Sequence, residues 1–334
     1  MTSPQLAIYG VMNEKIKKIE NSNLPLISGG PVNTVIIYNR ELDKIVIDVK
    51  WESITSNIKS FIDYWMMSND IDNFLIFHQN TAMKNTENYY SFPYLLIDTV
   101  GFIKKNPQYG KINLKSKKEK IYNCLNFAEH KHRTKIFDNL KERGLLDKGF
   151  VSCIYKGVVL SKKIDPMGKF HIDTDGWECF NYHITEKSYF NVVTETHHEI
   201  CEDNDGLHIT EKTYKALISQ PFIIVGQYGH LEKLREMGFQ TYPELFDESY
   251  DLIENPKDRI EFILDEIERL CNMDKSELEK IYNSVIWKVE HNRKIMVEFP
   301  IDEFAYKYLD SPIDFESYRA QDAKLNWKRN KGYK

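Results

Sequence analysis

The chain has 334 residues, of which 42% are hydrophobic and 13% aromatic, so it carries enough apolar surface for folded cores and is not an intrinsically disordered protein. Because a single core seldom grows beyond about 250–300 residues, we expect two domains. The 45 basic and 50 acidic residues are mixed along the sequence and give a net charge of −5, which argues against a general electrostatic attraction to nucleic acid.

The cysteine pattern is typical of reduced thiols. The five cysteines are widely spaced and form no Cys-x-x-Cys pair: Cys124, Cys153, Cys179, Cys201 and Cys271. This favours a cytoplasmic protein and argues against a zinc ribbon. The N-terminal sequence lacks a basic segment followed by a long apolar run, and no stretch reaches the roughly 18 apolar residues of a membrane span. We therefore expect a cytoplasmic protein without a membrane span.

The first hundred residues alternate short apolar runs with one amphipathic segment. This pattern predicts a helix at 54–68 and strands at 5–10, 34–39, 44–49 and 73–79. Residues 104–120 are rich in Lys, Gly, Pro and Asn and contain few large apolar side chains, so we interpret them as a linker. The predicted organisation is a domain at 1–115, a second domain at 118–300 and a C-terminal tail at 301–334.

After the linker, strands and helices alternate again. Helices are expected at 130–146, 210–219 and 230–238, between strands at 120–127, 149–155, 188–196 and 221–226. Residues 255–299 are helical, with a break where Asp274 or Ser276 caps a new helix. This order predicts an α/β fold of two Rossmann-like domains that face each other across a cleft, with C-terminal helices. In such folds, ligands bind at the carboxyl ends of the strands.

A charged pair opens the helix at 210–219. Thr210 is the predicted N-cap, which places Glu211 and Lys212 in the first turn, where backbone N–H groups attract anions. One interpretation is an ordinary helix-start acid with a solvated lysine beside it. The other is a nucleotide site in which Lys212 binds a diphosphate and Glu211 accepts hydrogen bonds from a ribose diol.

Two other strand ends are expected at the same edge of the sheet. Glu195 ends one strand, and Asn126 ends another, just before His132 and Arg133 open the next helix. A cation at a helix N-terminus opposes the helix dipole unless an anion neutralises it. These residues are therefore candidates for the same nucleotide site, while a strand-end acid and a surface arginine are the simpler interpretations.

The combination of these motifs resembles a known family. The stretch "VVTET", followed by "ITEKTYKAL" and "QPFIIVG", looks like the donor half of GT-B glycosyltransferases of the α-1,3-fucosyltransferase type. Together with "CLNF", "HKHRTKIFDNLKERGLLDKGFVS" and "GHLEKLREMGFQTYPELFDESYD", it also resembles a group of proteins, common in bacteriophages and marine bacteria, that are regarded as glycosyltransferases. The resemblance spans about residues 118 to 255.

The resemblance implies an enzyme that moves a hexose or pentose from a nucleotide-activated donor to a sugar or glycan acceptor. In this GT-B-like architecture the domain at 118–300 binds the nucleotide sugar, which is a substrate, and the domain at 1–115 lies on the acceptor side. No cofactor is implied. No metal is needed either, because fixed cations and a helix N-terminus can stabilise the departing diphosphate.

The family's site residues carry over to matching positions of this chain. The resemblance implies that Lys212 and Arg133 would bind the diphosphate, that Glu211 would bind the ribose, and that Glu195 would contact hydroxyls of the sugar or ribose. The neighbouring residues of the same segments are candidates for the same site: Thr210, Asn126 and His132. Where the related proteins usually have Leu-Asn-Arg, this chain has Leu125, Asn126 and Phe127. One basic residue is therefore missing, and His130 and His132 are the groups available nearby.

An inverting reaction also needs a base that takes the acceptor's proton, which is expected from the first domain. His78 ends the strand at 73–79, Glu87 lies in the loop after it, and Asp98 is a third candidate. Each of the three also fits a purely structural role.

Several alternatives remain open. His197, His198, Glu199 and Glu202 are metal-ligand types, but adjacent histidines cannot share one face of a strand, so no metal site is expected. The phage relatives suggest DNA bases as acceptors, which the acidic composition disfavours because a DNA-binding surface needs clustered cations. Only the tail at 323–334 is locally basic. A catalytically inactive nucleotide-binding protein of the same fold would fit the missing basic residue.

Overall fold

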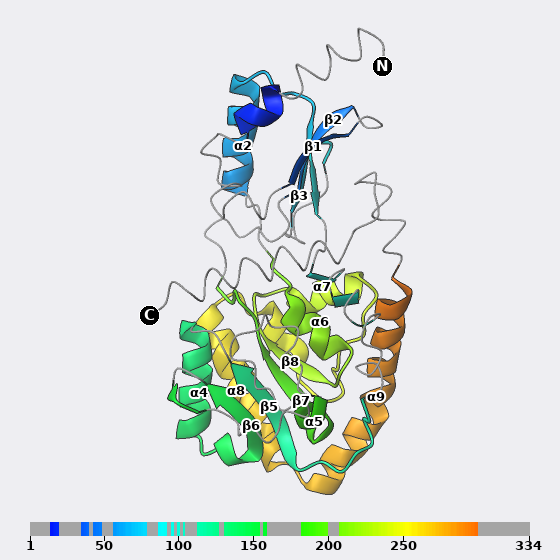
Figure 1. Cartoon of the computed structure of the whole chain (residues 1–334). Helices are drawn as coiled ribbons and strands as arrows, with labels where there is room; N and C mark the ends of the chain where they lie inside the picture. Colours follow the sequence, from blue (N-terminus) through cyan, green and yellow to red (C-terminus); the bar gives the residue numbers. More distant parts are fainter. Residues whose placement is uncertain are drawn as a thin grey trace. The chain divides into compact units, whose positions relative to one another are not determined.

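The structure is a computed structural model, and it describes residues 14–19, 35–39, 43–48, 56–78, 86–91, 95–96, 99–100, 103, 112–126, 130–153, 156–158, 182–199 and 207–299. The described residues belong to two compact units. One lies mainly within Met1–Leu95, and the other within Leu96–Ile200 and Ile209–Phe299. Each unit contains its own sheet with helices packed against it (Figure 1).

The first unit has a four-stranded sheet in the order β1-β2-β3-β4. Its strands are β1 (Val35–Asn39), β2 (Lys44–Asp48), β3 (Phe74–His78) and β4 (Tyr89–Ser91). β1 and β2 are antiparallel, whereas β3 is parallel to both β2 and β4. The apolar pattern of the sequence did not predict β4, and the strand expected at 5–10 lies outside the described residues.

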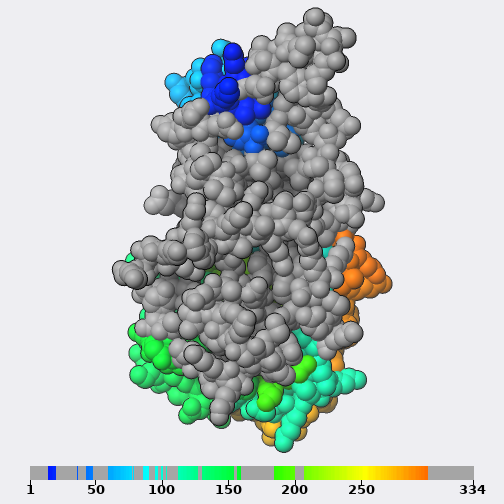
Figure 2. Space-filling view, viewed as in Figure 1, coloured from blue at the N-terminus to red at the C-terminus, as the bar shows by residue number. Residues whose placement is uncertain are grey.

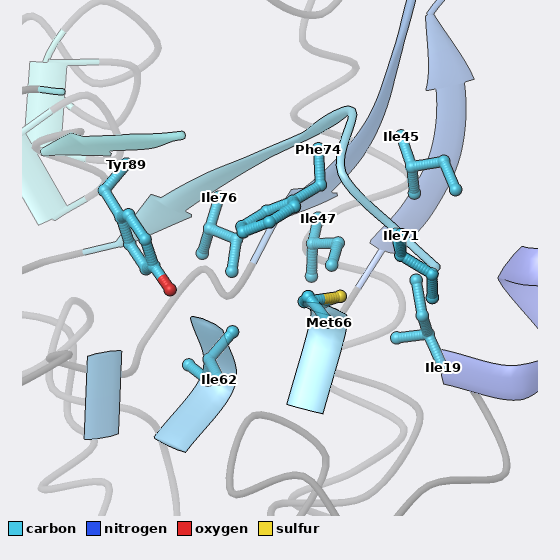
Figure 3. Close-up of a cluster of buried hydrophobic side chains, with 9 residues drawn as sticks. All are labelled: Ile19, Ile45, Ile47, Ile62, Met66, Ile71, Phe74, Ile76 and Tyr89. Carbon is cyan, nitrogen blue, oxygen red and sulfur yellow. The ribbon is translucent and has the colours of Figure 1, made fainter. Parts of the chain in front are cut away.

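The core of this unit lies between the sheet and helix α2 (Ser56–Ser68). Alternate residues of β2 and β3 point toward the helix, which presents Ile62 and Met66 one turn apart. Figure 3 shows these side chains packed together: Ile19, Ile45, Ile47, Ile62, Met66, Ile71, Phe74, Ile76 and Tyr89. Val46 and Leu75, which project to the other face, are also buried. Both faces of the sheet are therefore covered.

The second unit has four parallel strands in the order β6-β5-β7-β8. Its strands are β5 (Lys120–Asn126), β6 (Gly149–Cys153), β7 (Ser188–Thr194) and β8 (Phe222–Val225). The chain runs from β5 outward to β6 and then returns across β5 to β7. The strand order reverses at this point, which makes the β5–β7 boundary the switch point of the sheet. The predicted α/β class with parallel strands is confirmed.

The helices of the second unit pack against its sheet, and all but α5 lie where the amphipathic pattern predicted helices. They are α4 (Lys131–Glu142), α5 (Tyr182–Glu186), α6 (Glu211–Leu217), α7 (His230–Glu236), α8 (Pro256–Asn272) and α9 (Lys275–Glu298). Arg143, after α4, forms ion pairs with Glu261, Asp265 and Glu268 of α8. Arg293 of α9 donates a hydrogen bond to the carbonyl of Ile218, at the end of α6. Figure 2 shows the end of α9 at the surface, in orange.

Helix boundaries follow local chemistry. Asp274 caps α9 by accepting hydrogen bonds from the backbone nitrogens of Ser276 and Glu277 at 2.8 and 3.2 Å. Of the two residues proposed from the sequence, Asp274 is thus the cap. Gly144 and Gly238, with φ of +69° and +89°, follow α4 and α7 in a left-handed conformation that favours glycine. In the described part of the chain, no helix is both long and apolar enough to cross a membrane.

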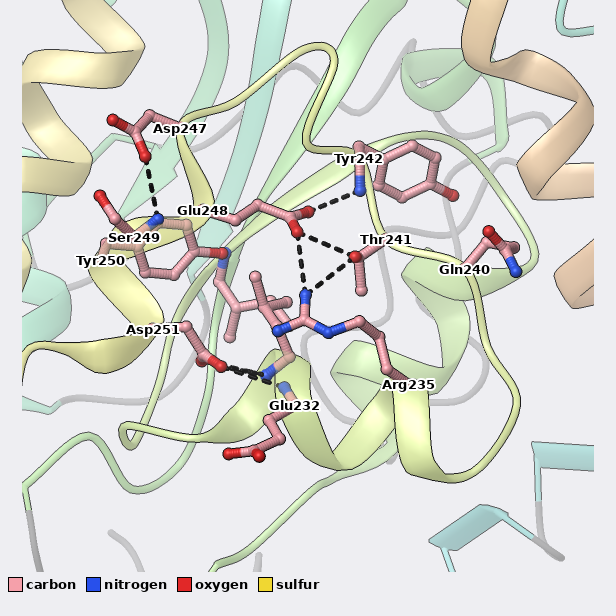
Figure 4. Close-up of polar contacts among 12 residues, drawn as sticks. Glu232, Arg235, Gln240, Thr241, Tyr242, Asp247, Glu248, Ser249, Tyr250 and Asp251 are labelled. Carbon is pink, nitrogen blue, oxygen red and sulfur yellow. Dashed lines mark hydrogen bonds and ion pairs between the residues drawn. The ribbon is translucent and has the colours of Figure 1, made fainter.

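The loop after α7 folds back over that helix and is fixed by two carboxylates (Figure 4). Glu248 accepts hydrogen bonds from Arg235 Nη1, Thr241 Oγ1 and the backbone nitrogen of Tyr242, at 3.0, 2.9 and 2.5 Å. Asp251 accepts hydrogen bonds from the backbone nitrogens of Leu231 and Glu232, in the first turn of α7. These contacts attach residues 240–251 to α7 without involving the ends of β5 or β7.

Candidate functional site at the carboxyl edge of β5 and β7

The carboxyl ends of β5 and β7 lie side by side at the switch point of the second sheet. The two strands are parallel neighbours, so Asn126 and Thr194 end at the same edge. The Thr194 hydroxyl donates a hydrogen bond to Asn126 Oδ1, and Asn126 Nδ2 lies 3.3 Å from Cys124 Sγ. Asn126 is buried. In this structure it joins the two strand ends, and its predicted contact with a nucleotide stays a prediction.

Glu195 follows directly after β7 and is fully buried, with 0% of its surface exposed. Its carboxylate accepts hydrogen bonds from the Thr210 backbone nitrogen at 3.0 Å, and from the hydroxyls of Thr210 and Thr213 at 2.5 Å each. Burial alone raises the pKa of this carboxyl, but the positive charge of Lys212 and the two hydroxyl donors outweigh it and hold the pKa below its usual value. Glu195 is therefore a buried carboxylate that connects β7 to α6.

The charged pair at the start of α6 is held by the protein's own groups. Thr210 is the N-cap, as predicted, and its hydroxyl accepts a hydrogen bond from the Lys212 backbone nitrogen. The Lys212 ammonium lies 2.7 Å from Glu211 Oε1 and 3.2 Å from each of the hydroxyls of Thr196 and Thr210. The Lys212 side chain is 31% exposed. It is thus a partly buried, fixed cation and not the freely solvated neighbour of the simpler interpretation.

Glu211 stays ionised in this environment. Burial opposes its charge, but Lys212 and Lys215 lower the pKa of its carboxyl to about 2. Because α6 has only seven residues, its dipole is short. The attraction that this segment offers to an anion therefore comes mainly from the Lys212 side chain.

His132 and Arg133, in the first turn of α4, turn inward. His132 Nε2 donates a hydrogen bond to the carbonyl of Glu195 at 2.8 Å. Arg133 Nη2 donates to the carbonyls of Thr194 and Glu195, both at 3.2 Å, and the side chain is only 4% exposed. The surface arginine of the simpler interpretation is therefore wrong. Arg133 ties α4 to the end of β7, and its contact with a diphosphate stays a prediction.

Histidines gather at the same edge. The rings of His132 and His198 are stacked with centroids 4.3 Å apart, and the His130 ring lies 5.5 Å from that of His132. Burial, together with nearby positive groups, lowers the pKa of His132 to about 3 and that of His198 to about 4. Burial and the charges of Arg133 and Lys212 also lower the pKa of His130. At neutral pH these imidazoles are uncharged and can donate or accept hydrogen bonds.

No group of three His, Cys, Asp or Glu side chains able to hold a metal ion is found among the described residues. His198, whose position in the sequence suggested only a metal ligand, instead stacks on His132. Glu202 of the same segment lies outside the described residues.

Arg259 of α8 organises the loops behind this edge and was not anticipated from the sequence. Its guanidinium donates hydrogen bonds to the carbonyls of Gly226 at 2.9 Å, Glu254 at 3.1 Å and His198 at 2.5 Å, and to that of Ile253. The side chain is almost completely buried. Arg259 therefore joins the loop after β7 to the loop after β8.

The base candidates of the first unit lie at opposite ends of its sheet. His78 is the last residue of β3, is buried, and has a pKa lowered by burial to about 4. Glu87 precedes β4, at the amino edge, and its exposed side chain lies 3.6 Å from Lys44 Nζ. Because β3 and β4 are parallel, His78 and Glu87 cannot serve one site at the same edge. Asp98 lies outside the described residues.

Glu87 also lines a cavity of about 700 Å³ at the amino edge of the first unit. The walls of the cavity include Lys59, Asp63, Phe74 and Tyr89. None of the residues predicted for the nucleotide site contributes to it. The cavity and the cluster of predicted site residues thus lie in different units. The charged and polar side chains at the edge of β5 and β7 make that edge the better candidate for a functional site.

The structure brings together the residues that the sequence assigned to the second domain: Asn126, His132, Arg133, Glu195, Thr210, Glu211 and Lys212. It adds Thr196, Thr213, His198 and Arg259, which contact them. Comparisons of the chain with protein families, with curated proteins and with solved structures find no match. The function is therefore inferred from the site itself.

Proposed function

We propose that the chain is a metal-independent glycosyltransferase, in which the diphosphate of a nucleotide-sugar donor binds at the carboxyl edge of β5 and β7. The observation that carries this proposal is the convergence of two strand–helix junctions at the switch point of a parallel sheet. In open α/β sheets, this crevice is the usual ligand site.

The electrostatics of the edge can accommodate an anionic ligand. The charges of its two carboxylates, Glu195 and Glu211, are offset by those of Arg133 and Lys212, and Glu195 is also surrounded by buried hydrogen-bond donors. Both cations are close enough to His130 to lower its pKa. A diphosphate that displaced Glu211 from Lys212 would meet the freed ammonium beside several neutral imidazoles.

The same groups suit the chemistry of sugar transfer. When the bond between the sugar and the diphosphate breaks, negative charge develops on the leaving phosphate oxygens. Lys212, in the first turn of α6, would stabilise that charge. Glu211 would leave the Lys212 ammonium and accept hydrogen bonds from a ribose diol, which would anchor the nucleoside. In a GT-B-like arrangement, the first unit would bind the acceptor and supply the base. His78 is uncharged above a pH of about 4, so it can accept a proton, but the lowered pKa makes it a weaker base than a solvated histidine.

A binding screen with a matched lysine control tests this proposal. Thermal unfolding would be followed with UDP, GDP, ADP and CMP compounds, because a ligand present at about a hundredfold over its Kd stabilises the folded state by roughly 2.7 kcal/mol. Lys212→Ala, with a Kd raised about tenfold, should reduce this stabilisation to roughly 1.4 kcal/mol. Lys233→Ala should keep it, since Lys233 is similarly exposed (29%) and similarly ion-paired, with Glu236 of the same helix α7.

Activity separates transfer from binding alone. Release of the nucleoside diphosphate from a nucleotide sugar that shifts the unfolding temperature is expected for a transferase. Binding without release would instead support an inactive nucleotide-binding protein, and tight, salt-dependent binding of duplex DNA would support a DNA acceptor. The absence of any nucleotide-dependent shift would reject the proposal.

A further inference from the structure

The direction of the hydrogen bonds around Thr210 follows from the chemistry of its neighbours. An ionised carboxylate can only accept, so the Thr210 hydroxyl must donate its single proton to Glu195, 2.5 Å away. The two lone pairs of that oxygen then face Lys212, whose backbone nitrogen and ammonium lie 3.3 and 3.2 Å away. Glu195 thereby makes Thr210 an acceptor for Lys212.

Thr196 is held in a parallel way. Its backbone nitrogen donates to Glu195 Oε2 at 3.2 Å, and its hydroxyl accepts a hydrogen bond from the Lys212 ammonium at 3.2 Å. Both hydroxyls that fix the ammonium therefore belong to residues bound to the same carboxylate. The third acceptor is Glu211, the neighbour of Lys212 in the chain.

The carboxylate itself is fixed from the other side. The Thr213 hydroxyl donates its proton to Glu195 Oε1 at 2.5 Å, so the contact between Thr213 Oγ1 and His230 Nε2, at 3.3 Å, must be donated by the histidine. With four donors around two oxygens and no exposed surface, Glu195 has no room for a substrate hydroxyl.

We propose that Glu195 is a positioning residue: through the hydroxyls of Thr210 and Thr196 it holds the Lys212 ammonium at the anion-binding edge, and it does not contact the substrate. This inference rests on the proposed function only in taking a diphosphate as the ligand of Lys212. It assigns Glu195 a role different from the sugar or ribose contact that the resemblance implied.

A double-mutant cycle tests the route of action. The Kd for inorganic pyrophosphate would be measured by calorimetry for the full chain, for Glu195→Gln, for Lys212→Ala and for the double variant. We expect each single variant to bind about tenfold more weakly, because a charge-assisted contact is lost. The double variant should bind no more weakly than Lys212→Ala, since Glu195 acts through Lys212. Additive losses would show a direct contact of Glu195 and overturn the proposal.

Two controls separate positioning from general stability. Glu248→Gln removes a partly buried carboxylate that also accepts a backbone N–H and a threonine hydroxyl, and it should lower the Tm without changing the pyrophosphate Kd. If Glu195→Gln does not fold, Thr210→Val replaces it as the test. That variant should weaken binding as Lys212→Ala does, whereas Thr210→Ser, which keeps the hydroxyl, should restore it. Normal binding by Thr210→Val would reject the proposal.

A readout without ligand keeps this inference distinct from the proposed function. Trace acetylation followed by peptide mass spectrometry reports the reactivity of Lys212 relative to Lys233. Glu195→Gln should accelerate labelling of Lys212 by about threefold to tenfold, the effect expected when hydrogen bonds of ordinary strength are released. If wild-type protein binds neither pyrophosphate nor nucleotides, the proposed function fails, while this ratio still tests the positioning. An unchanged ratio would reject the positioning.

Discussion

Glu195, which is buried, and Glu248, which is partly buried, are two carboxylates of the second unit that accept hydrogen bonds from the same kinds of donors. Each takes a backbone N–H and a threonine hydroxyl, from Thr210 in one case and Thr241 in the other. Each also lies near a basic side chain. They differ in what they connect: Glu248 joins residues of one loop and its adjacent helix, whereas Glu195 joins β7 to α6 at the switch point of the sheet.

The two glutamates also contact their cations differently. Glu248 pairs directly with Arg235, at 3.0 Å, whereas Glu195 reaches Lys212 through the hydroxyls of Thr196 and Thr210. Burial raises the pKa of Glu248 despite its donors, while the surroundings of Glu195 lower its pKa. The direct ion pair of Glu248 with Arg235 therefore attaches a loop to α7. The indirect contact of Glu195 with Lys212 instead holds the Lys212 ammonium at the candidate site.

Truncation should separate the two carboxylates most strongly. Glu195→Ala leaves its buried donors and a nearby cation without their partner, and we expect it to destabilise the fold by about 3–5 kcal/mol. Glu248→Ala should cost about 1–3 kcal/mol, because water can reach donors around a side chain that is 11% exposed. Urea unfolding at pH 7 measures both. An equal loss in the two variants would show that burial does not distinguish them.

The pH dependence of stability should differ in sign. The folded-state pKa of Glu195 is lowered, so its contribution is complete above the unfolded-state pKa and is lost as the pH falls through the folded-state pKa. The folded-state pKa of Glu248 is raised, so the cost of its ionised form is relieved as the pH falls. From pH 7 to 4, wild type should lose stability relative to Glu195→Gln and gain it relative to Glu248→Gln, by at most about 1.4 kcal/mol per pH unit.

Chemical unfolding at several pH values checks this prediction. The free energy of unfolding of each variant is subtracted from that of the wild type at each pH, and a difference that changes in the same direction for both variants would contradict it.

The counter-ion of Lys212 can be tested with two ligands. Glu211→Gln removes the ion pair in the free protein, so inorganic pyrophosphate should bind about threefold more tightly, as expected for the loss of a partly exposed pair. A nucleoside diphosphate should instead bind more weakly, because it also loses the proposed ribose contact. Calorimetry with both ligands measures the difference. Parallel changes for the two ligands would argue against a ribose contact.

The smallest effect is expected from metal removal. If fixed cations stabilise the leaving diphosphate, EDTA should leave the rate of nucleotide-sugar turnover unchanged. An activity lost with EDTA and restored by manganese or magnesium would contradict this prediction.

Local sequence signals predicted much of the second unit. Apolar runs and caps placed β5, β7 and β8, and they identified Thr210 as the start of α6. The geometry of parallel strands then places the strand ends at Asn126 and Glu195 at one edge. The strands and the cap depend on residues close together in the chain, which a periodic pattern records directly.

The orientation of side chains at the site could not be predicted in this way. The inward turn of Arg133 depends on carbonyls more than sixty residues away, at Thr194 and Glu195. Likewise, a glutamate at a strand end looks exposed in sequence, because its burial is decided by α6 and not by its neighbours. β4 was also missed, since its three residues give too short a pattern.

The contacts of Arg259 have a consequence for how the chain acquires this edge during synthesis. The residues of the edge lie between positions 126 and 213, yet the loops after β7 and β8 are joined by a guanidinium from α8. While residue 259 is still inside the ribosome, a nascent chain has those loops without their common donor. We therefore expect the edge to be complete only after α8 has been synthesised and has packed against the sheet.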